Sequence, residues 1–185
     1  MVKTASTMLP LGTYAPDFAL QDMISDDFIK LSEYTANSKA TLIIFMCNHC
    51  PYVIHIIDQL IKLTQSYEHK PLSIIAINSN DPEQYPDDSP EKMKEFAKKH
   101  HFHFPYLFDS TQEVARSYEA ACTPDFFLFN QNMELIYRGQ FDDSRPGGQI
   151  TVTGEDLKHA IDCVLTHQVN EKPQKASLGC NIKWK

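Results

Sequence analysis

Three stretches of the chain have a clear hydrophobic pattern. Residues 41–46 form an unbroken apolar run, which is typical of a central strand covered on both faces. Residues 72–77 form a second run of this kind. Between them, from Cys50 to about Tyr67, apolar residues recur at the i, i+3, i+4, i+7 spacing of a helix with one buried face. The pattern predicts a buried strand, a helix and a second buried strand in succession.

The rest of the chain alternates short apolar runs with polar or helical segments. Pro16 suits the start of an edge strand. We expect strands near residues 15–20, 28–31, 106–108, 126–129 and 134–138, helices at 90–99, 109–118 and 153–167, a loop at 78–90 and a tail from about 173. This order predicts one α/β domain over residues 1–185, with a central mixed sheet flanked by helices and a β extension at the N-terminal end.

The charge balance narrows the classes of partner. The chain has 17 basic and 24 acidic residues, a formal net charge of −7. No basic cluster marks a surface for nucleic acid or anionic lipid, so we expect neither partner. The first ten residues contain no apolar core of a secretory signal, and no run is long enough to span a membrane.

The cysteine content indicates a compartment. Five cysteines are too few and too scattered for a disulfide scaffold, and an odd number cannot all pair. We therefore expect a reducing, cytoplasmic location, where two cysteines three residues apart are more often catalytic or metal-binding than structural.

The strongest chemical signal is the segment Cys47-Asn48-His49-Cys50-Pro51, placed where the first buried strand meets the helix. A helix N-terminus offers free N–H groups and partial positive charge, which stabilise a thiolate. His49 would lower the pKa of Cys47 further. The second thiol can then resolve a mixed disulfide. The alternative is a pair of inert buried cysteines, which would not need a helix start and a histidine beside them.

Several segments together resemble a known superfamily. The element order, with Cys47 and Cys50 after the third strand and Thr123-Pro124 before a late strand, resembles the thioredoxin fold. Residues 15–20 and 31–34 resemble its alkyl hydroperoxide reductase/thiol-specific antioxidant branch. Residues 47–53, 76–81, 122–129 and 179–185 resemble a peroxiredoxin-like bacterial group within that superfamily.

This resemblance implies a thiol–disulfide oxidoreductase without a cofactor. Cys47 would be the more exposed nucleophile and Cys50 the resolving thiol, with Pro124 as a cis-proline facing them. Thr123 and Asn48 would contact the substrate. The expected partners are protein or small-molecule disulfides or thiols, and an upstream reductant of the thioredoxin type. The direction of electron flow depends on a reduction potential that the sequence does not specify.

The other cysteines leave alternatives open. Cys122 is an accessory redox thiol or a small core residue. Cys180 becomes a resolving thiol if the tail folds back, and is otherwise incidental. Cys163 lies on the apolar face of the last predicted helix.

The strand that leads into Cys47 differs from that of thioredoxin in one respect. Thioredoxin has a buried acid under its second cysteine, on the strand that enters the motif, but residues 41–46 contain no carboxylate. A general base for Cys50 must come from elsewhere, and Glu33, Asp81 or a water are the candidates.

Two other functions compete. A peroxiredoxin-type thiol peroxidase needs a proline and a threonine ahead of its cysteine, and an arginine. Ile43, Cys47 and Thr123 stand in those three places, so an exchange enzyme fits better. A soft-metal protein could hold copper or zinc with Cys47, Cys50, His49 and His55. We expect the thiols to act in exchange, with no metal bound.

Overall fold

The computed structural model describes residues 3–185 of the chain. Its strands and helices, in chain order, are β1 (Lys3–Ala5), β2 (Ala19–Asp22), β3 (Phe28–Lys30), α1 (Leu31–Tyr34), β4 (Ala40–Phe45), α2 (Pro51–Gln65), β5 (Leu72–Asn78), a 3₁₀ turn η1 (Pro86–Asp88), α3 (Pro90–Lys99), β6 (Tyr106–Phe108), α4 (Glu113–Ser117), β7 (Cys122–Thr123), β8 (Asp125–Asn130), β9 (Leu135–Tyr137), α5 (Glu155–Leu165) and β10 (Leu178–Asn181).

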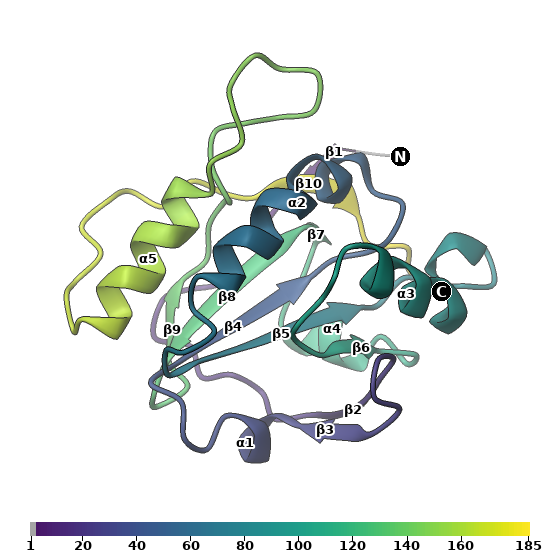
Figure 1. Cartoon of the computed structure of the whole chain (residues 1–185), viewed down its shortest axis with the longest axis horizontal. Coiled ribbons are helices and arrows are strands. Elements are labelled where there is room, and N and C mark those ends of the chain that lie inside the picture. The colour runs from purple at the N-terminus through teal and green to yellow at the C-terminus, as the bar shows by residue number, and fades with distance from the viewer. Residues whose placement is uncertain (1–2) are drawn as a thin grey trace.

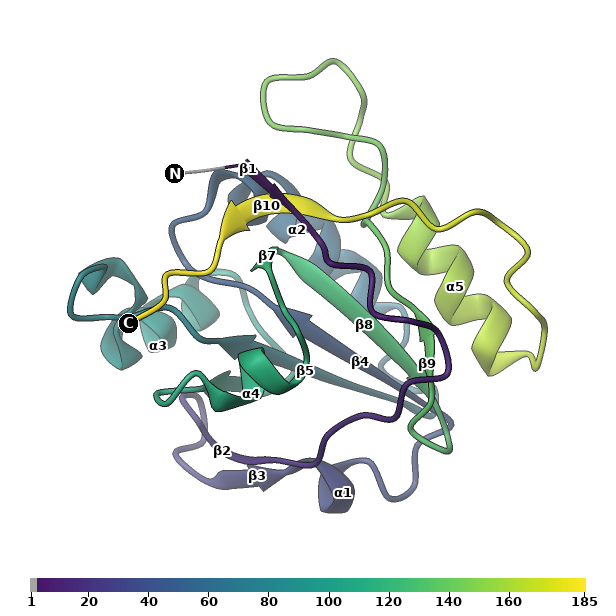
Figure 2. The ribbon, with the colours of Figure 1, turned by 180° about the vertical axis from the view of Figure 1, so that it is seen from behind.

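A mixed sheet forms the centre, as the sequence predicts. Its strand order is β3-β2-β6-β5-β4-β8-β9. The central strand β4 runs parallel to β5 and antiparallel to β8, and β5 runs parallel to β6. Helices cover both faces, with α2, α3 and α5 in front of the sheet in Figure 1 and α4 behind it in Figure 2.

Alternation along β4 explains the two layers of core. Successive side chains of a strand point to opposite faces. Leu42 and Ile44 join the apolar cluster that includes α2, α3 and α5. Ile43 and Phe45 join the other cluster, which includes α4. Every residue of β4 is buried, which accounts for the unbroken apolar run in the sequence.

The start of α2 carries the two thiols to one end of β4. Cys50 is the N-cap, and Pro51 occupies the first helical turn, where the missing N–H costs little. The predicted helix therefore begins as expected. The segment predicted as a helix from Asp109 starts later, at Glu113, because the Asp109 carboxylate accepts from the backbone N–H groups of Val114 and Ala115.

The C-terminal tail is not a loose extension. β10 lies between β1 and β7 in a second, three-stranded sheet, antiparallel to both. Figure 2 shows this strand crossing the end of the molecule where α2 begins. The sequence predicted neither β1 nor β10, since each is a short run without alternation of apolar and polar residues. This second sheet covers the end of β4 where the thiols lie.

Candidate active site

Cys50 lies at the meeting point of three segments. Its Sγ is 3.1 Å from the carbonyl oxygen of Thr123 on β7 and 2.9 Å from Sγ of Cys180 on β10. The side chain is fully buried. Hydrogen bonding from Cys47 is the main cause that lowers the pKa of Cys50, to about 5, and Cys180 and the backbone N–H of Val53 contribute against the opposing effect of burial. We therefore expect Cys50 to ionise before Cys47.

Cys47 has the opposite electrostatics. Only 1% of the residue is exposed, and its Sγ lies 3.4 Å from the hydroxyl of Thr123. Donation to Cys50 raises the pKa of Cys47 well above its usual value, and burial and the charge of Asp88 act in the same direction. The prediction of an exposed Cys47 is wrong, because the thiol is packed against Thr123 inside the protein. The raised pKa of Cys47 and the lowered pKa of Cys50 arise mainly from one shared hydrogen bond, so the identity of the ionised thiol stays a prediction.

Asp88 is a functional candidate that sequence reasoning missed. This fully buried carboxylate accepts from the backbone N–H of Asn48 at 2.8 Å and from the side-chain amide of Asn80 at 2.7 Å. Burial alone would raise the pKa of Asp88, but hydrogen bonding to His49, Asn80 and Asn48 lowers it. Its only signal in the sequence was an acidic pair inside a segment expected to be a loop.

His49 pairs with Asp88. Its Nδ1 lies 2.8 Å from Asp88 Oδ2, and its ring stacks on Tyr85 with centroids 5.7 Å apart. Hydrogen bonding to Asp88 raises the pKa of His49, against burial. The expectation that His49 lowers the pKa of Cys47 is therefore not met, since Asp88 takes the imidazole.

The other proposed bases lie elsewhere. Glu33 is exposed on α1 and pairs with Lys30. Asp81 is buried, and its side chain accepts from the backbone N–H of Glu83. Among these carboxylates, Asp88 is the one that lies beside the thiols.

Thr123 and Pro124 face the dithiol as the resemblance implied. The peptide bond between them is cis. Thr123 presents its hydroxyl to Cys47 and its carbonyl to Cys50. Asn48, in contrast, is held within the protein, because its amide donates to Asp87 O and its carbonyl accepts from the Tyr106 hydroxyl.

Cys122 and Cys163 are packed in the protein core. The Cys122 thiol is fully buried and contacts Pro124 O at 3.6 Å. Burial, and then the charge of Asp125, raise the pKa of Cys122 far above its usual value. Cys163 lies on α5, 3.6 Å from a ring nitrogen of His159. These surroundings favour a core role for Cys122 over a redox role.

Three potential metal ligands lie close together beside the dithiol. Cys47, His49 and Asp88 each offer an atom within 4.8 Å of the others. His55 is not part of this cluster and contacts the Ser144 hydroxyl at 3.0 Å. Both Asp88 oxygens already have partners, so this carboxylate is better suited to ordering the segment than to binding a cation.

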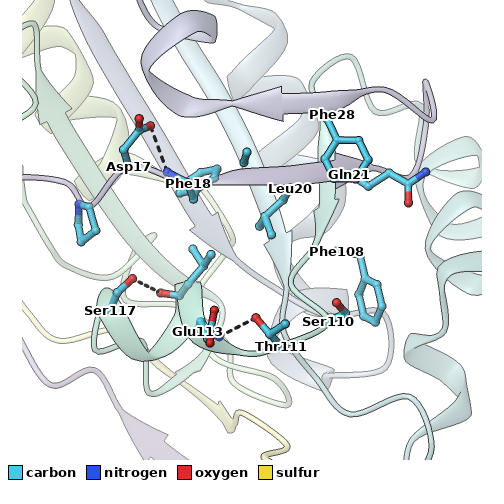
Figure 3. A pocket seen from close by; sticks show the side chains of 13 residues that line it. Asp17, Phe18, Leu20, Gln21, Phe28, Phe108, Ser110, Thr111, Glu113 and Ser117 are labelled. Carbon is cyan, nitrogen blue, oxygen red and sulfur yellow. Dashed lines mark hydrogen bonds between the residues drawn. The ribbon is translucent and has the colours of Figure 1, made fainter.

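Cavities lie mostly away from the thiols. A pocket of about 570 Å³ lies between the β2–β3 hairpin and α4, and Phe18, Leu20, Phe108 and Glu113 are among the residues that line it (Figure 3). A smaller hollow of about 310 Å³ adjoins the dithiol segment on the outside and is lined by Asn48, His49 and residues of α3. Within residues 3–185, no helix is long and apolar enough to cross a membrane.

Comparisons with known proteins add a family and a fold. The AhpC/TSA family model matches residues 11–138. Thiol-disulfide oxidoreductase ResA of Geobacillus kaustophilus is 25% identical over 163 residues, which cover 87% of this chain and 82% of that protein.

Solved structures match over most of the chain. An uncharacterized conserved protein from Geobacillus kaustophilus is 51% identical, with a TM-score of 0.96 over 100% of this chain and 97% of its own. A thiol:disulfide interchange protein of the DsbE type from Chlorobium tepidum has a TM-score of 0.67 at 23% identity, over 85% of this chain and 99% of its own, which shows a common fold.

Proposed function

The chain belongs to the AhpC/TSA family, and from that premise we propose that it is a thiol–disulfide oxidoreductase whose redox centre is the Cys47/Cys50 dithiol. The observation that carries the proposal is geometric: the two thiols meet at the start of α2, where the Thr123 hydroxyl faces the Cys47 sulfur and the Thr123 carbonyl faces the Cys50 sulfur. A thiolate on Cys50 next to a neutral thiol on Cys47 is a nucleophile with its proton donor already in place.

The reaction follows from this arrangement. The Cys50 thiolate attacks one sulfur of a disulfide substrate, and the other substrate sulfur leaves as a thiolate that takes up a proton. Cys47 then loses its proton and attacks Cys50 Sγ, so that the Cys47–Cys50 disulfide forms and the second half of the substrate is released. The roles are the reverse of those predicted from the sequence, because the helix N-cap is Cys50.

Burial adds a condition on the substrate. Both sulfurs are almost completely covered. A bulky disulfide therefore reaches Cys50 only after a covering segment moves. We propose small or protein disulfides or thiols as substrates, with a thioredoxin-type reductant upstream. A reducing, cytoplasmic compartment is proposed on the odd number of cysteines.

The test is a thiol-exchange assay with oxidised glutathione as the substrate. Cys50→Ser should lower the rate at least about a thousandfold, since the remaining groups cannot replace the thiolate. Cys47→Ser should form a mixed disulfide between Cys50 and glutathione, but it cannot form the Cys47–Cys50 disulfide. Cys163→Ser, on the distant helix α5, is the matched control and should behave as the wild type. Full activity of Cys50→Ser would contradict the proposal.

Two measurements refine the function. The reduction potential gives the direction of electron flow: a value near about −270 mV indicates a reductant, and one near about −120 mV indicates an oxidant. Consumption of hydrogen peroxide with a thiol reductant distinguishes the peroxidase alternative. Rapid turnover at low peroxide would favour the peroxidase over the exchange enzyme.

A further inference from the structure

The C-terminal strand brings a third sulfur to the redox centre. Cys180 Sγ lies 2.9 Å from Cys50 Sγ, and Cys180 is buried. In the register of the second sheet, Cys180 is paired with Thr123, the residue whose carbonyl contacts Cys50. Figure 2 shows β10 lying against β7 on one side and β1 on the other. Cys50 is therefore placed between two cysteines, Cys47 within its own turn and Cys180 from 130 residues along the chain.

The strand that carries Cys180 is held firmly. Ser177 donates its hydroxyl to Pro124 O at 2.7 Å. Beyond the strand, the backbone N–H of Lys183 donates to the Asn80 side chain at 2.8 Å. Asn80 also donates to Asp88, so it links the tail to the buried carboxylate beside the dithiol. These bonds fix the position of Cys180 from both sides.

Gly179 shows how closely the strand approaches. A Cβ at this position would lie 2.0 Å from the Thr123 carbonyl oxygen. A side chain there would push β10 away from β7, and Cys180 with it. The absence of a side chain at Gly179 is thus a requirement for the contact between Cys50 and Cys180.

We propose that Cys180 is a third redox residue, which exchanges with the Cys47–Cys50 disulfide to give a Cys50–Cys180 disulfide and a reduced Cys47. This inference rests on the proposed function, which supplies the first disulfide. Cys180 loses its proton and attacks Cys50 Sγ. The bond between Cys47 and Cys50 breaks, its electron pair stays on Cys47, and Cys47 takes up a proton. The exchange needs no further oxidant, because one disulfide replaces another.

The surroundings of Cys180 change with the state of the dithiol. In the reduced protein, burial, and then the hydrogen bond and charge of Cys50, raise the pKa of Cys180 to about 12. Once Cys50 is in a disulfide, it carries no charge and that contribution disappears. Lys183 continues to favour the Cys180 thiolate. Oxidation of the dithiol thus prepares Cys180 to attack.

The exchange has a consequence for reactivity. With Cys50 tied to β10, Cys47 is released as a thiol close to His49, and His49 lines the hollow of about 310 Å³. The oxidised protein then has two disulfide forms, and the second one presents Cys47 as a thiol.

The test follows the mixed disulfide between Cys50 and glutathione in the variant Cys47→Ser. This variant lacks the Cys47 thiol, so residue 47 cannot displace the glutathione. The reduced variant is treated with oxidised glutathione, quenched with acid, alkylated and digested with trypsin, which separates residues 40–62 from residues 176–183. We expect these two peptides to be recovered as a disulfide-linked pair. Glutathione should leave Cys50 at least about tenfold faster than in Cys47→Ser/Cys180→Ser, because a neighbouring thiol acts at high effective concentration.

The controls separate the inference from the proposed function. Cys47→Ser/Cys163→Ser should give the same linked pair as Cys47→Ser. If wild-type protein forms the Cys47–Cys50 disulfide but Cys47→Ser retains glutathione on Cys50, the third redox residue is wrong and the oxidoreductase stands. If wild-type protein forms neither disulfide, both proposals fail. Circular dichroism of each variant, compared with the wild type, establishes that it is folded.

Discussion

The two sides of the dithiol are built from different parts of the chain and act in opposite directions. On the acidic side, defined here by Asn48, His49 and Asp88, a buried carboxylate raises the pKa of Cys47. On the sulfur side, defined by Cys50, Thr123 and Cys180, hydrogen bonds lower the pKa of Cys50. Identical side chains three residues apart thus differ because they take opposite roles in their shared hydrogen bond and because their long-range neighbours differ.

The difference shows which interactions determine a reactive thiol. Both cysteines are buried, so desolvation does not distinguish them. The main distinction is the hydrogen bond between the two sulfurs, which raises the pKa of Cys47 and lowers that of Cys50. The charge of Asp88 acts further on Cys47, and hydrogen bonds from Cys180 and the Val53 N–H act further on Cys50. Five predictions test this comparison between the acidic side and the sulfur side.

The largest effect is expected from removing the ionised sulfur itself. The ultraviolet absorbance of thiolate should titrate near pH 5 in the wild type and in Cys47→Ser, whose hydroxyl still donates to Cys50. Cys50→Ser should show no titration there. Cys47→Ala, which cannot donate, should raise the pKa of Cys50. A titration near pH 5 that persists in Cys50→Ser would assign the thiolate to Cys47 instead of Cys50.

The same shift makes stability depend on pH. The pKa of Cys50 in the folded protein lies below its unfolded value of about 8.5. Its ionised form therefore contributes stability that is fully present above the unfolded value and is lost as the pH falls through about 5. Urea unfolding across this range should show that contribution in Cys47→Ser and not in Cys47→Ser/Cys50→Ser.

The next largest effect is expected at Gly179, which tests the sulfur side. Gly179→Ala should lower the free energy of unfolding by about 2–3 kcal/mol, because the new Cβ meets the Thr123 carbonyl. Displacing β10 should also raise the pKa of Cys50 and speed its alkylation. Gly147→Ala is the control, since that glycine has φ +75° and open space, and it should cost about 1 kcal/mol without changing the thiols. Equal thiol reactivity in both variants would contradict the role of β10.

A comparable or smaller effect is expected at Asp88, which tests the acidic side. Asp88→Ala removes the acceptor of the Asn48 N–H and of the Asn80 amide, and should cost about 2 kcal/mol in thermal unfolding. Asp88→Asn, which keeps the shape and one acceptor, should cost about half as much. Both should lower the pKa of Cys47, because the charge that raises it is gone. An unchanged Cys47 titration would exclude Asp88 as the cause.

The smallest effect is expected at His49. Its pKa is raised in the folded protein, so the contact with Asp88 contributes stability that is present below the unfolded value of about 6.5 and is lost as the pH rises through the folded value. His49→Gln should cost less than about 1 kcal/mol, since the ring is partly exposed. The difference from wild type should shrink at alkaline pH. A difference that grows with pH would mean that His49 acts through another group.

Local pattern alone determined most of the central sheet. The apolar runs at residues 41–46 and 72–77 and the helical spacing from Cys50 are properties of neighbouring residues, and the structure places β4, β5 and α2 there. The dithiol position followed from the same information. The family resemblance added the cis peptide bond before Pro124, which no local pattern indicated.

Only the tertiary structure decided which thiol ionises and which groups surround it. Asp88 reaches the dithiol from a segment 40 residues away, and Cys180 reaches it from 130 residues away. Neither contact leaves a periodic signal in the chain, because β7 and β10 are too short to alternate and the 3₁₀ turn that holds Asp88 lies in a polar segment. Sequence periodicity reports burial along one element. A pKa depends on charges and donors that packing brings together from several elements.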